Sequence, residues 1–135
     1  ENSILTPNPK EFERLAGKWS DDFERLEKQK QLAQHLKSII VLKGANTSIA
    51  IPSGDVYFNS TGNPGMSTGG TGDVLTGMLA GLLAQNYSPL DTALLGVFLH
   101  GLSGDVAIHE KGMNSLIATD IVDFLPQAFL RAGYK

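Results

Sequence analysis

A short glycine-rich segment contains the residues best suited to chemistry. Gly69, Gly70 and Gly72 lead to Asp73, and seven of the fifteen glycines in the chain lie between residues 62 and 81. Glycine reaches backbone angles that other residues avoid, so successive N–H groups can converge on one point. A helix expected to begin at or near Asp73 adds unpaired N–H groups and a partial positive charge. The segment therefore predicts a site for a phosphate or a developing oxyanion.

Asp73 determines what chemistry such a site could perform. A carboxylate at a helix start is often only an N-cap. Beside an anion site, however, it can accept or donate a proton close to bound phosphate. The segment has no Lys-Ser or Lys-Thr pair after the glycines, as a P-loop would, and it lacks the third glycine of the dinucleotide fingerprint. We therefore expect Asp73 to act as an acid or base at a phosphate-handling site of another kind.

The hydrophobic pattern places this segment in a chain of the α/β class. Residues 39–42 form a continuous apolar run, mostly β-branched, which is typical of a strand buried on both faces. Further strands are expected at residues 3–6, 48–52 and 55–59, the last two as a hairpin. Helices are expected at residues 10–15, 20–36, 73–84, 88–109 and 120–131, with Pro126 kinking the last one. Because so little sheet accompanies so many helices, we interpret residues 1–135 as the C-terminal part of a larger α/β domain.

Composition and charge exclude several classes of protein. A hydrophobic fraction of 41% and a charged fraction of 19% are ordinary for a globular chain. A net charge of −3 argues against non-specific binding of nucleic acid. The absence of cysteine excludes disulfides and thiolate metal sites. Polar residues and glycines interrupt every apolar run before the roughly 20 residues of a membrane span, and no signal peptide opens the sequence. We expect a cytoplasmic protein that binds neither nucleic acid nor membrane.

Three motifs, in this order along the chain, resemble the ADP/ATP-dependent NAD(P)H-hydrate dehydratase family. They are residues 6–12 (TPNPKEF), 41–47 (VLKGANT) and 62–81, which include the Gly-Thr-Gly-Asp turn. The turn alone is shared by ribokinase-like sugar and vitamin kinases, whereas the Asn-Pro-Gly-Met stretch at residues 63–66 favours the dehydratase. The resemblance implies the ribokinase-like fold, a three-layer α/β/α arrangement, of which this chain would form the C-terminal part.

The resemblance implies a metabolite-repair reaction catalysed by a hydro-lyase. The enzyme would dehydrate the hydrated nicotinamide nucleotide (S)-NAD(P)HX to NAD(P)H, with ADP or ATP as co-substrate. Phosphorylation of the ring hydroxyl would convert it into a good leaving group, which explains why a kinase-like site performs a dehydration. Magnesium is expected with the nucleotide, although its ligands cannot be identified in the sequence. The family also suggests a homo-oligomer, often a tetramer.

The resemblance assigns roles to individual residues. Asp73 would be the acid/base residue, and Gly70 and Gly72 would supply oxyanion-hole N–H groups. The adenine nucleotide would contact Lys43, Gly44, Ala45, Asn46, Thr47, Asn63 and Gly72. The hydrated nicotinamide would contact Asn8, Glu11 and Asp73. Asn8 stands where the family usually has histidine; it can form hydrogen bonds but cannot titrate.

Several alternatives remain open. A ribokinase-like kinase of a small hydroxylated metabolite, with Asp73 as general base, fits the same turn. Glu11 could simply interact with the dipole of its helix, and Lys43 could be a solvated strand end. We expect His100 and Asp105 to have structural roles.

Overall fold

The computed structural model describes residues 2–135. The chain divides into two compact units, one formed by residues 1–59 with 88–94 and the other by residues 60–87 with 95–135. The interpretation of residues 1–135 as part of one larger domain stays a prediction.

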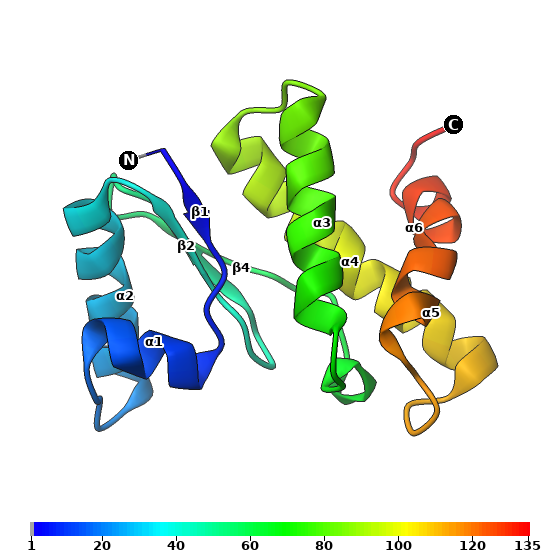
Figure 1. Cartoon of the computed structure of the whole chain (residues 1–135), viewed down its shortest axis with the longest axis horizontal. Helices are drawn as coiled ribbons and strands as arrows, with labels where there is room; N and C mark the ends of the chain where they lie inside the picture. Colours follow the sequence, from blue (N-terminus) through cyan, green and yellow to red (C-terminus); the bar gives the residue numbers. More distant parts are fainter. Residues whose placement is uncertain (1) are drawn as a thin grey trace. The chain divides into compact units, whose positions relative to one another are not determined.

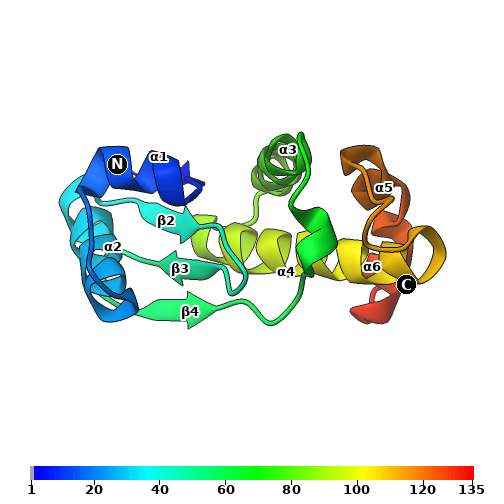
Figure 2. The same cartoon turned by 90° about the horizontal axis from the view of Figure 1, so that it is seen from below.

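The first unit contains a mixed sheet of four strands in the order β1-β2-β3-β4. Strand β1 pairs with β2 in parallel, and the other neighbours pair antiparallel, as the alternating arrows of β2, β3 and β4 show in Figure 2. Every residue of β2 is buried, as its continuous apolar run predicts. The predicted hairpin is also confirmed, because Ile49 of β3 faces Tyr57 of β4. The strands span Ile4–Leu5 (β1), Ile39–Leu42 (β2), Ser48–Ala50 (β3) and Val56–Phe58 (β4).

Helices α1 (Pro9–Ala16) and α2 (Asp22–Leu36) lie on the same side of this sheet (Figure 1). Asp21 caps α2 by accepting a hydrogen bond from the N–H of Glu24 at 2.7 Å. Gly17 ends α1 at a φ of +84°, a conformation that favours glycine. Both helix boundaries therefore follow from local residue types that the sequence displays.

A fully buried glutamine joins α2 to the sheet. Gln29 donates from Nε2 to the carbonyl oxygens of Ile40 at 2.9 Å and Ser48 at 3.1 Å. Its Oε1 accepts a hydrogen bond from the Ser48 hydroxyl at 2.7 Å. The side chain is 0% exposed, so these bonds replace water completely around its amide. Gln29 therefore fixes the register of the helix against β2 and β3.

The second unit is built from helices. Its elements are a 3₁₀ turn at Pro64–Met66 (η1), α3 (Thr71–Ala84), the later part of α4 (Pro89–Lys111), α5 (Ala118–Asp123) and α6 (Leu125–Arg131). Helix α3 packs against α5. Only Leu75, Leu79 and Leu82 of α3 are buried in the described chain, so its broad apolar face is not covered along its whole width.

The C-terminal helix expected at residues 120–131 is in fact two helices. Helix α5 begins at Ala118, with Ile117 as its N-cap, and the Asp120 carboxylate accepts a hydrogen bond from the N–H of Ile117 at 2.9 Å. The break falls at Phe124, and Pro126 is the second residue of α6. Proline has no N–H for the carbonyl four residues earlier, and it suits a helix start. Pro126 thus separates two helices instead of kinking one.

Helix α4 differs from the expectation that no segment could span a membrane. Over its most apolar 18 residues the mean hydropathy is 1.2. By length and composition alone, this helix could cross a membrane. Half of that window is buried inside the protein, and core helices of globular proteins pass the same test. The glycines taken as interruptions lower the mean hydropathy only slightly, because leucine, valine and alanine surround them.

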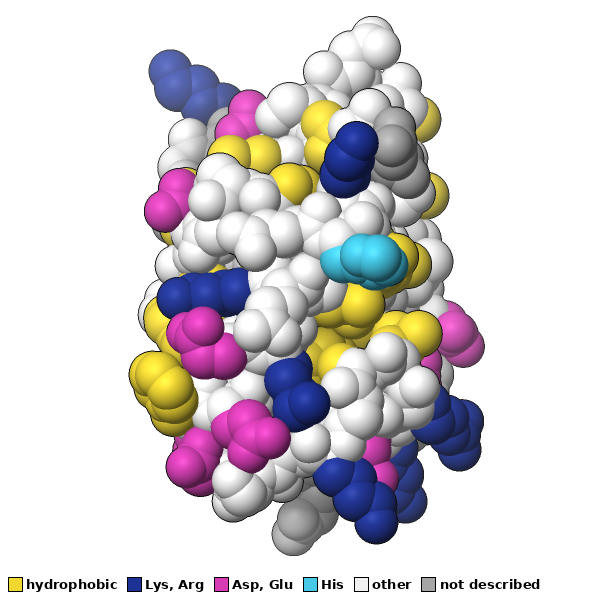
Figure 3. Space-filling model, turned by 90° about the vertical axis from the view of Figure 1, so that its left-hand side faces the viewer, with side chains coloured by type: hydrophobic (Ala, Val, Ile, Leu, Met, Phe, Trp, Pro, Cys, Tyr) yellow, Lys and Arg dark blue, Asp and Glu magenta, His cyan; other side chains and the backbone are white. Residues whose placement is uncertain are grey.

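The face of the molecule shown in Figure 3 carries charges of both signs. Acidic side chains gather toward the lower left of this view and several basic ones toward the lower right. Exposed apolar side chains lie among them, and Phe23 of α2 is the most exposed large one at 73%.

Candidate functional site

The predicted anion turn is the start of α3. Gly70 is the N-cap of this helix, with φ +91° and ψ −11°, and no side chain caps the helix start within residues 2–135. Of the three glycines at positions 69, 70 and 72, Gly70 alone has a positive φ. The turn therefore depends on one left-handed glycine, whereas we expected three glycines with unusual angles. A Cβ on Gly70 would also come within 3.1 Å of the Ala118 Cβ.

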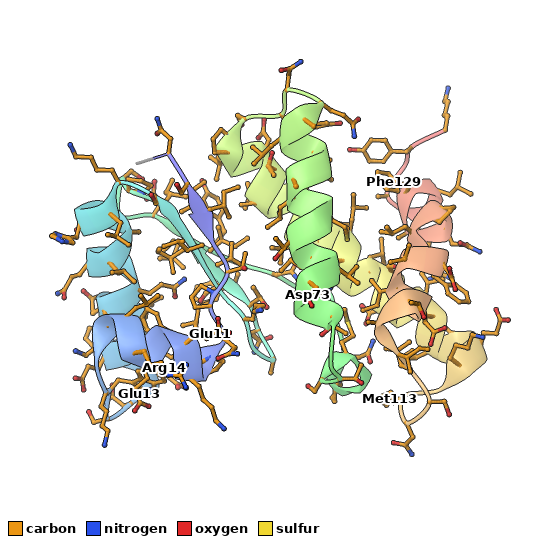
Figure 4. The ribbon with its side chains drawn as sticks, in the orientation of Figure 1. Glu11, Glu13, Arg14, Asp73, Met113 and Phe129 are labelled. Atoms are coloured by element: carbon orange, nitrogen blue, oxygen red, sulfur yellow. The ribbon has the colours of Figure 1, made fainter. Side chains whose placement is uncertain are left out.

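Asp73 lies near the start of the helix, as expected, but it is not the first helical residue. Helix α3 begins at Thr71, which makes Asp73 its third residue. Because Gly70 occupies the N-cap position, Asp73 cannot be the N-cap itself, and this alternative is removed. The Asp73 side chain is exposed at the end of α3 where the helix begins (Figure 4). An exposed carboxylate next to unpaired helix N–H groups can exchange protons with a ligand held by those groups.

Hydrogen bonds of Thr71 hold the turn in place. Its hydroxyl lies 3.0 Å from the carbonyl oxygens of both Met66 and Thr68. Its own carbonyl oxygen lies 2.9 Å from Nε2 of His100 on α4. Sequence reasoning did not identify Thr71 as a site residue. The available signal was a hydroxyl residue between two glycines, which can supply the hydrogen bonds that the glycines cannot.

The loop before the turn is fixed by Asp105 of α4. One oxygen of its carboxylate accepts from the N–H of Gly62 at 2.9 Å, and the other accepts from Nδ2 of Asn63 at 2.8 Å. The Oδ1 of Asn63 in turn accepts from the N–H of Gly65 at 3.0 Å. Both ends of the Asn63 amide are therefore engaged within the loop. Its assigned contact with the nucleotide stays a prediction, while its structural role is evident.

Two glycines of α4 allow the loop to approach the helix closely. A Cβ on Gly101 would collide with the Thr61 hydroxyl and lie 2.7 Å from its carbonyl carbon. A Cβ on Gly104 would collide with the sulfur of Met66. The Thr61 hydroxyl also donates to the carbonyl oxygen of Phe98 at 2.8 Å. The segment 61–66 thus lies directly on the backbone of α4, which makes it a rigid lead into the turn.

The residues assigned to the hydrated nicotinamide in the first unit form a helix cap. The Oδ1 of Asn8 accepts from the N–H of Glu11 at 2.9 Å, and Glu11 accepts from the N–H of Asn8 at 3.5 Å. This reciprocal pair is a capping box at the start of α1, where Glu11 is labelled in Figure 4. The alternative of a helix-start role for Glu11 therefore has direct support, and its contact with substrate stays a prediction.

The segment 43–47 forms a turn at the end of β2. The N–H of Lys43 donates to the carbonyl oxygen of Pro7 at 3.0 Å, so this strand end lies next to the loop that contains Asn8. The Thr47 hydroxyl lies 3.4 Å from the N–H of Gly44 and 3.3 Å from its carbonyl oxygen. Gly44, Ala45 and Asn46 are exposed. The carboxyl ends of strands are where open α/β sheets bind ligands.

The predicted site residues thus form two groups, one in each unit. The loop 61–66 and the turn 69–73 contain Asn63, Gly70, Gly72 and Asp73, and the first unit contains Asn8, Glu11 and residues 43–47. A groove of about 480 Å³ in the first unit is lined by Asn46, Ser48, Phe58 and residues of α2. A second groove, of about 320 Å³, includes none of the predicted site residues.

The described residues do not form a cage for a cation. Within residues 2–135, no group of three or more histidine, cysteine, aspartate or glutamate side chains could hold a metal ion. Magnesium commonly binds through nucleotide phosphates with only one or two carboxylates, so its expected place with the nucleotide does not require such a cage.

Comparisons with known proteins agree with the motifs. The model of a family described as NAD(P)H-hydrate dehydratase matches residues 1–127. A bifunctional NAD(P)H-hydrate repair enzyme of Moorella thermoacetica is 47% identical over 125 residues, which is 91% of this chain and 24% of that protein. The chain therefore spans about a quarter of the length of this curated relative.

Solved structures support the fold. An ADP/ATP-dependent NAD(P)H-hydrate dehydratase from Bacillus subtilis, co-crystallised with ATP and Mg²⁺, is 41% identical with a TM-score of 0.86, over 95% of this chain and 47% of that one. A ribokinase-like superfamily protein from Enterococcus faecalis is 35% identical with a TM-score of 0.79, over 95% and 44% of the two chains. The predicted ribokinase-like α/β fold is confirmed.

Proposed function

The chain belongs to the NAD(P)H-hydrate dehydratase family, and from this we propose that the protein dehydrates (S)-NAD(P)HX to NAD(P)H with ADP or ATP as co-substrate. The observation that carries the proposal is the family match over residues 1–127 together with an uncapped helix start that presents Asp73. ADP/ATP dependence is named for the Bacillus subtilis protein. Nucleotide and hydrated nicotinamide are therefore the proposed ligands.

The proposed chemistry uses the turn in two ways. The N–H groups at the start of α3, including that of Gly72, bind the phosphoryl group as negative charge develops on it. The Asp73 carboxylate takes the proton of the nicotinamide hydroxyl while that oxygen attacks the terminal phosphorus of the nucleotide. The bond from phosphorus to the remaining nucleotide breaks, and the electron pair leaves with that nucleotide. Phosphate then departs from the ring with its oxygen, a ring proton is lost, and the C=C bond of NAD(P)H forms.

Gly70 contributes through its conformation. Its left-handed φ of +91° turns the chain so that the N–H groups beginning the helix are not covered by a side chain. In the first unit, we propose that Lys43, Gly44, Ala45, Asn46 and Thr47 contact the nucleotide and that Asn8 and Glu11 contact the hydrated nicotinamide. Cytoplasmic location and a homo-oligomeric state are part of the same proposal, on the strength of the composition and the family.

A coupled assay on the full-length protein tests this function. With ADP and (S)-NAD(P)HX, the absorbance of NAD(P)H should appear, and one phosphate should be released for each NAD(P)H formed. Asp73→Ala should abolish the reaction. Asp91→Ala is a matched control, because Asp91 is also an exposed third residue of a helix and should be dispensable. Full activity of Asp73→Ala would contradict the assignment of the acid/base residue.

The kinase alternative predicts a different result in the same assay. A ribokinase-like kinase would require ATP, would leave NAD(P)HX unchanged and would produce a phosphorylated metabolite. A solved hydroxyethylthiazole kinase from Pyrococcus horikoshii has a TM-score of 0.76 at 16% identity, which shows the shared fold alone. We therefore keep the kinase as an outcome of the test.

A further inference from the structure

A histidine of α4 contacts the peptide that leads into the anion site. Nε2 of His100 lies 2.9 Å from the carbonyl oxygen of Thr71, which is 29 residues earlier in the chain. A carbonyl oxygen only accepts hydrogen bonds, so Nε2 must carry a proton and donate it. The carbonyl of Thr71 belongs to the same planar peptide unit as the N–H of Gly72. His100 therefore restrains the peptide whose N–H is proposed to bind the phosphoryl group.

This restraint acts at the position where the turn has little side-chain support of its own. Gly70 and Gly72 have no side chains, so Gly70 occupies the N-cap position without a side-chain hydrogen bond to the helix. Thr71, between them, is held from one side by its hydroxyl, which bonds within the loop, and from the other by His100. His100 is half-buried, and the next residue is the buried Gly101 that packs against Thr61. The imidazole thus extends from a well-packed part of the helix.

We propose that His100 is a positioning residue for the anion turn: its Nε2–H orients the Thr71–Gly72 peptide and thereby aims the Gly72 N–H at the transferring phosphoryl group. This inference rests on the proposed function. His100 acts through the peptide and does not itself touch the phosphate. Transition-state stabilisation by a backbone N–H depends on its direction, and a displacement of about 1 Å costs about 100-fold in rate.

Variants that keep or remove the donor test the proposal in the full-length protein. His100→Gln places a side-chain N–H close to the position of Nε2, so its kcat should stay within about threefold of the parent, whereas His100→Leu should lower kcat about 10- to 100-fold by misdirecting one oxyanion donor. The KM for (S)-NAD(P)HX should change little in both. If the leucine variant does not fold, His100→Asn replaces it, because its shorter amide cannot reach Thr71. His109→Leu, on the exposed end of the same helix, is the matched control and should retain activity.

The difference in kcat between the glutamine and leucine variants distinguishes a positioning role of His100 from a purely structural one. A structural role would make activity follow melting temperature in every variant. The proposal requires kcat to follow the presence of the donor, with the glutamine variant active even where its melting temperature falls to that of the leucine variant. Equal kcat values for the glutamine and leucine variants would overturn it, as would an unchanged kcat in the leucine variant.

A measurement that does not depend on turnover distinguishes this inference from the proposed function. In ¹⁵N-labelled protein, the Gly72 amide resonance of His100→Gln should match the parent, and that of His100→Leu should shift. Titration with ADP should perturb the Gly72 resonance in the parent, with binding about tenfold weaker in the leucine variant. If the parent shows no dehydratase activity, the proposed function fails, while these resonances still test the restraint. An unshifted Gly72 resonance in the leucine variant would overturn the positioning role.

Discussion

The carboxylate of Asp105 accepts a hydrogen bond at 2.9 Å from the N–H of Gly62, 43 residues earlier in the chain. Its second oxygen accepts from Asn63 at 2.8 Å, so one side chain of α4 holds two successive residues of the loop. Gly62 has a φ of +107°, a conformation that favours glycine. Asp105 thus holds the first two residues of the loop that leads into the glycine-rich turn.

Asp105→Asn should therefore destabilise the protein and disorder the loop. The new NH₂ group faces a donor, so either Gly62 or Asn63 loses its acceptor, at a cost of about 1–2 kcal/mol. Denaturant unfolding would measure this loss, and activity should fall with it because the turn follows the loop. Asp123→Asn, at the exposed end of α5, is the control and should change the unfolding free energy by less than about 0.5 kcal/mol. Equal unfolding free energies of the two variants would contradict the role of Asp105 in holding the loop.

The two close-packed glycines of α4 should respond differently to alanine. Gly101→Ala meets backbone, with the Gly62 nitrogen 2.8 Å from the added Cβ, and should cost about 1–3 kcal/mol through overpacking. Gly104→Ala meets the flexible side chain of Met66, which can move aside. Alanine is a better helix former than glycine by up to about 1 kcal/mol, and this gain should offset much of the strain in Gly104→Ala. Thermal unfolding of both variants checks the order, and a larger loss for Gly104→Ala would show that the loop yields more easily than Met66.

Replacement of Gln29 tests the link between α2 and the sheet. Gln29→Met keeps the length of the side chain but removes all three of its hydrogen bonds, leaving the Ile40 and Ser48 carbonyl oxygens buried without this partner. The expected loss is about 2–4 kcal/mol of unfolding free energy, since each such buried group costs about 1–3 kcal/mol. Gln34→Met on the exposed side of α2 is the matched control. A neutral Gln29→Met variant would show that packing alone secures this helix.

The carboxylate of Glu24 should stabilise the folded protein near neutral pH, and this stabilisation should be lost in acid. Its pKa lies below the ordinary value of 4.5, first because the Ser20 hydroxyl donates to it and next because the Ser20 N–H does so, while partial desolvation opposes the shift and Lys28 adds a smaller lowering. A group whose pKa is lower in the folded state stabilises above its unfolded pKa, and this contribution disappears as pH falls through the folded pKa.

Comparing the parent with Glu24→Gln across pH measures this contribution. The difference in unfolding free energy should be constant near neutral pH and should shrink below the ordinary pKa of 4.5. Glu110→Gln, on the exposed end of α4, is the control variant. A difference that grows toward low pH would mean that the sign of the shift is wrong.

The sequence was most informative where a local residue type determines the conformation. Asp21 and Gly17 mark helix ends in the sequence and in the structure, and the apolar run 39–42 is the buried strand expected. The start of α3 was expected at or near Asp73, a usual residue type for a cap. The cap is Gly70, which has no side chain to signal the role, so the helix begins two residues earlier, at Thr71. The last helix was predicted as one because its hydrophobic period continues across the break before Pro126.

The candidate site was predicted only in part for a similar reason. The glycine-rich turn and Asp73 are adjacent in sequence, so the motif exposes them together. Asp105 and His100 act on residues 43 and 29 positions away, and no spacing rule reveals such contacts. Asp105 holds the loop as its expected structural role implies, whereas the contact of His100 with Thr71 became visible only in three dimensions. Asp105 and His100 are distant in sequence from the residues they contact because helix packing, and not a local turn, brings them together.

The close approach of loop 61–66 to α4 determines which parts of the chain should unfold together. Glycine is a poor helix former, so Gly101 and Gly104 each weaken this stretch of α4 by about 1 kcal/mol until the loop covers it. The helix then depends on a segment some forty residues earlier for its persistence. Amide hydrogens of residues 100–105 and 61–66 should accordingly exchange with solvent as one cooperative unit, so that the loop and the helix beneath it open and close together.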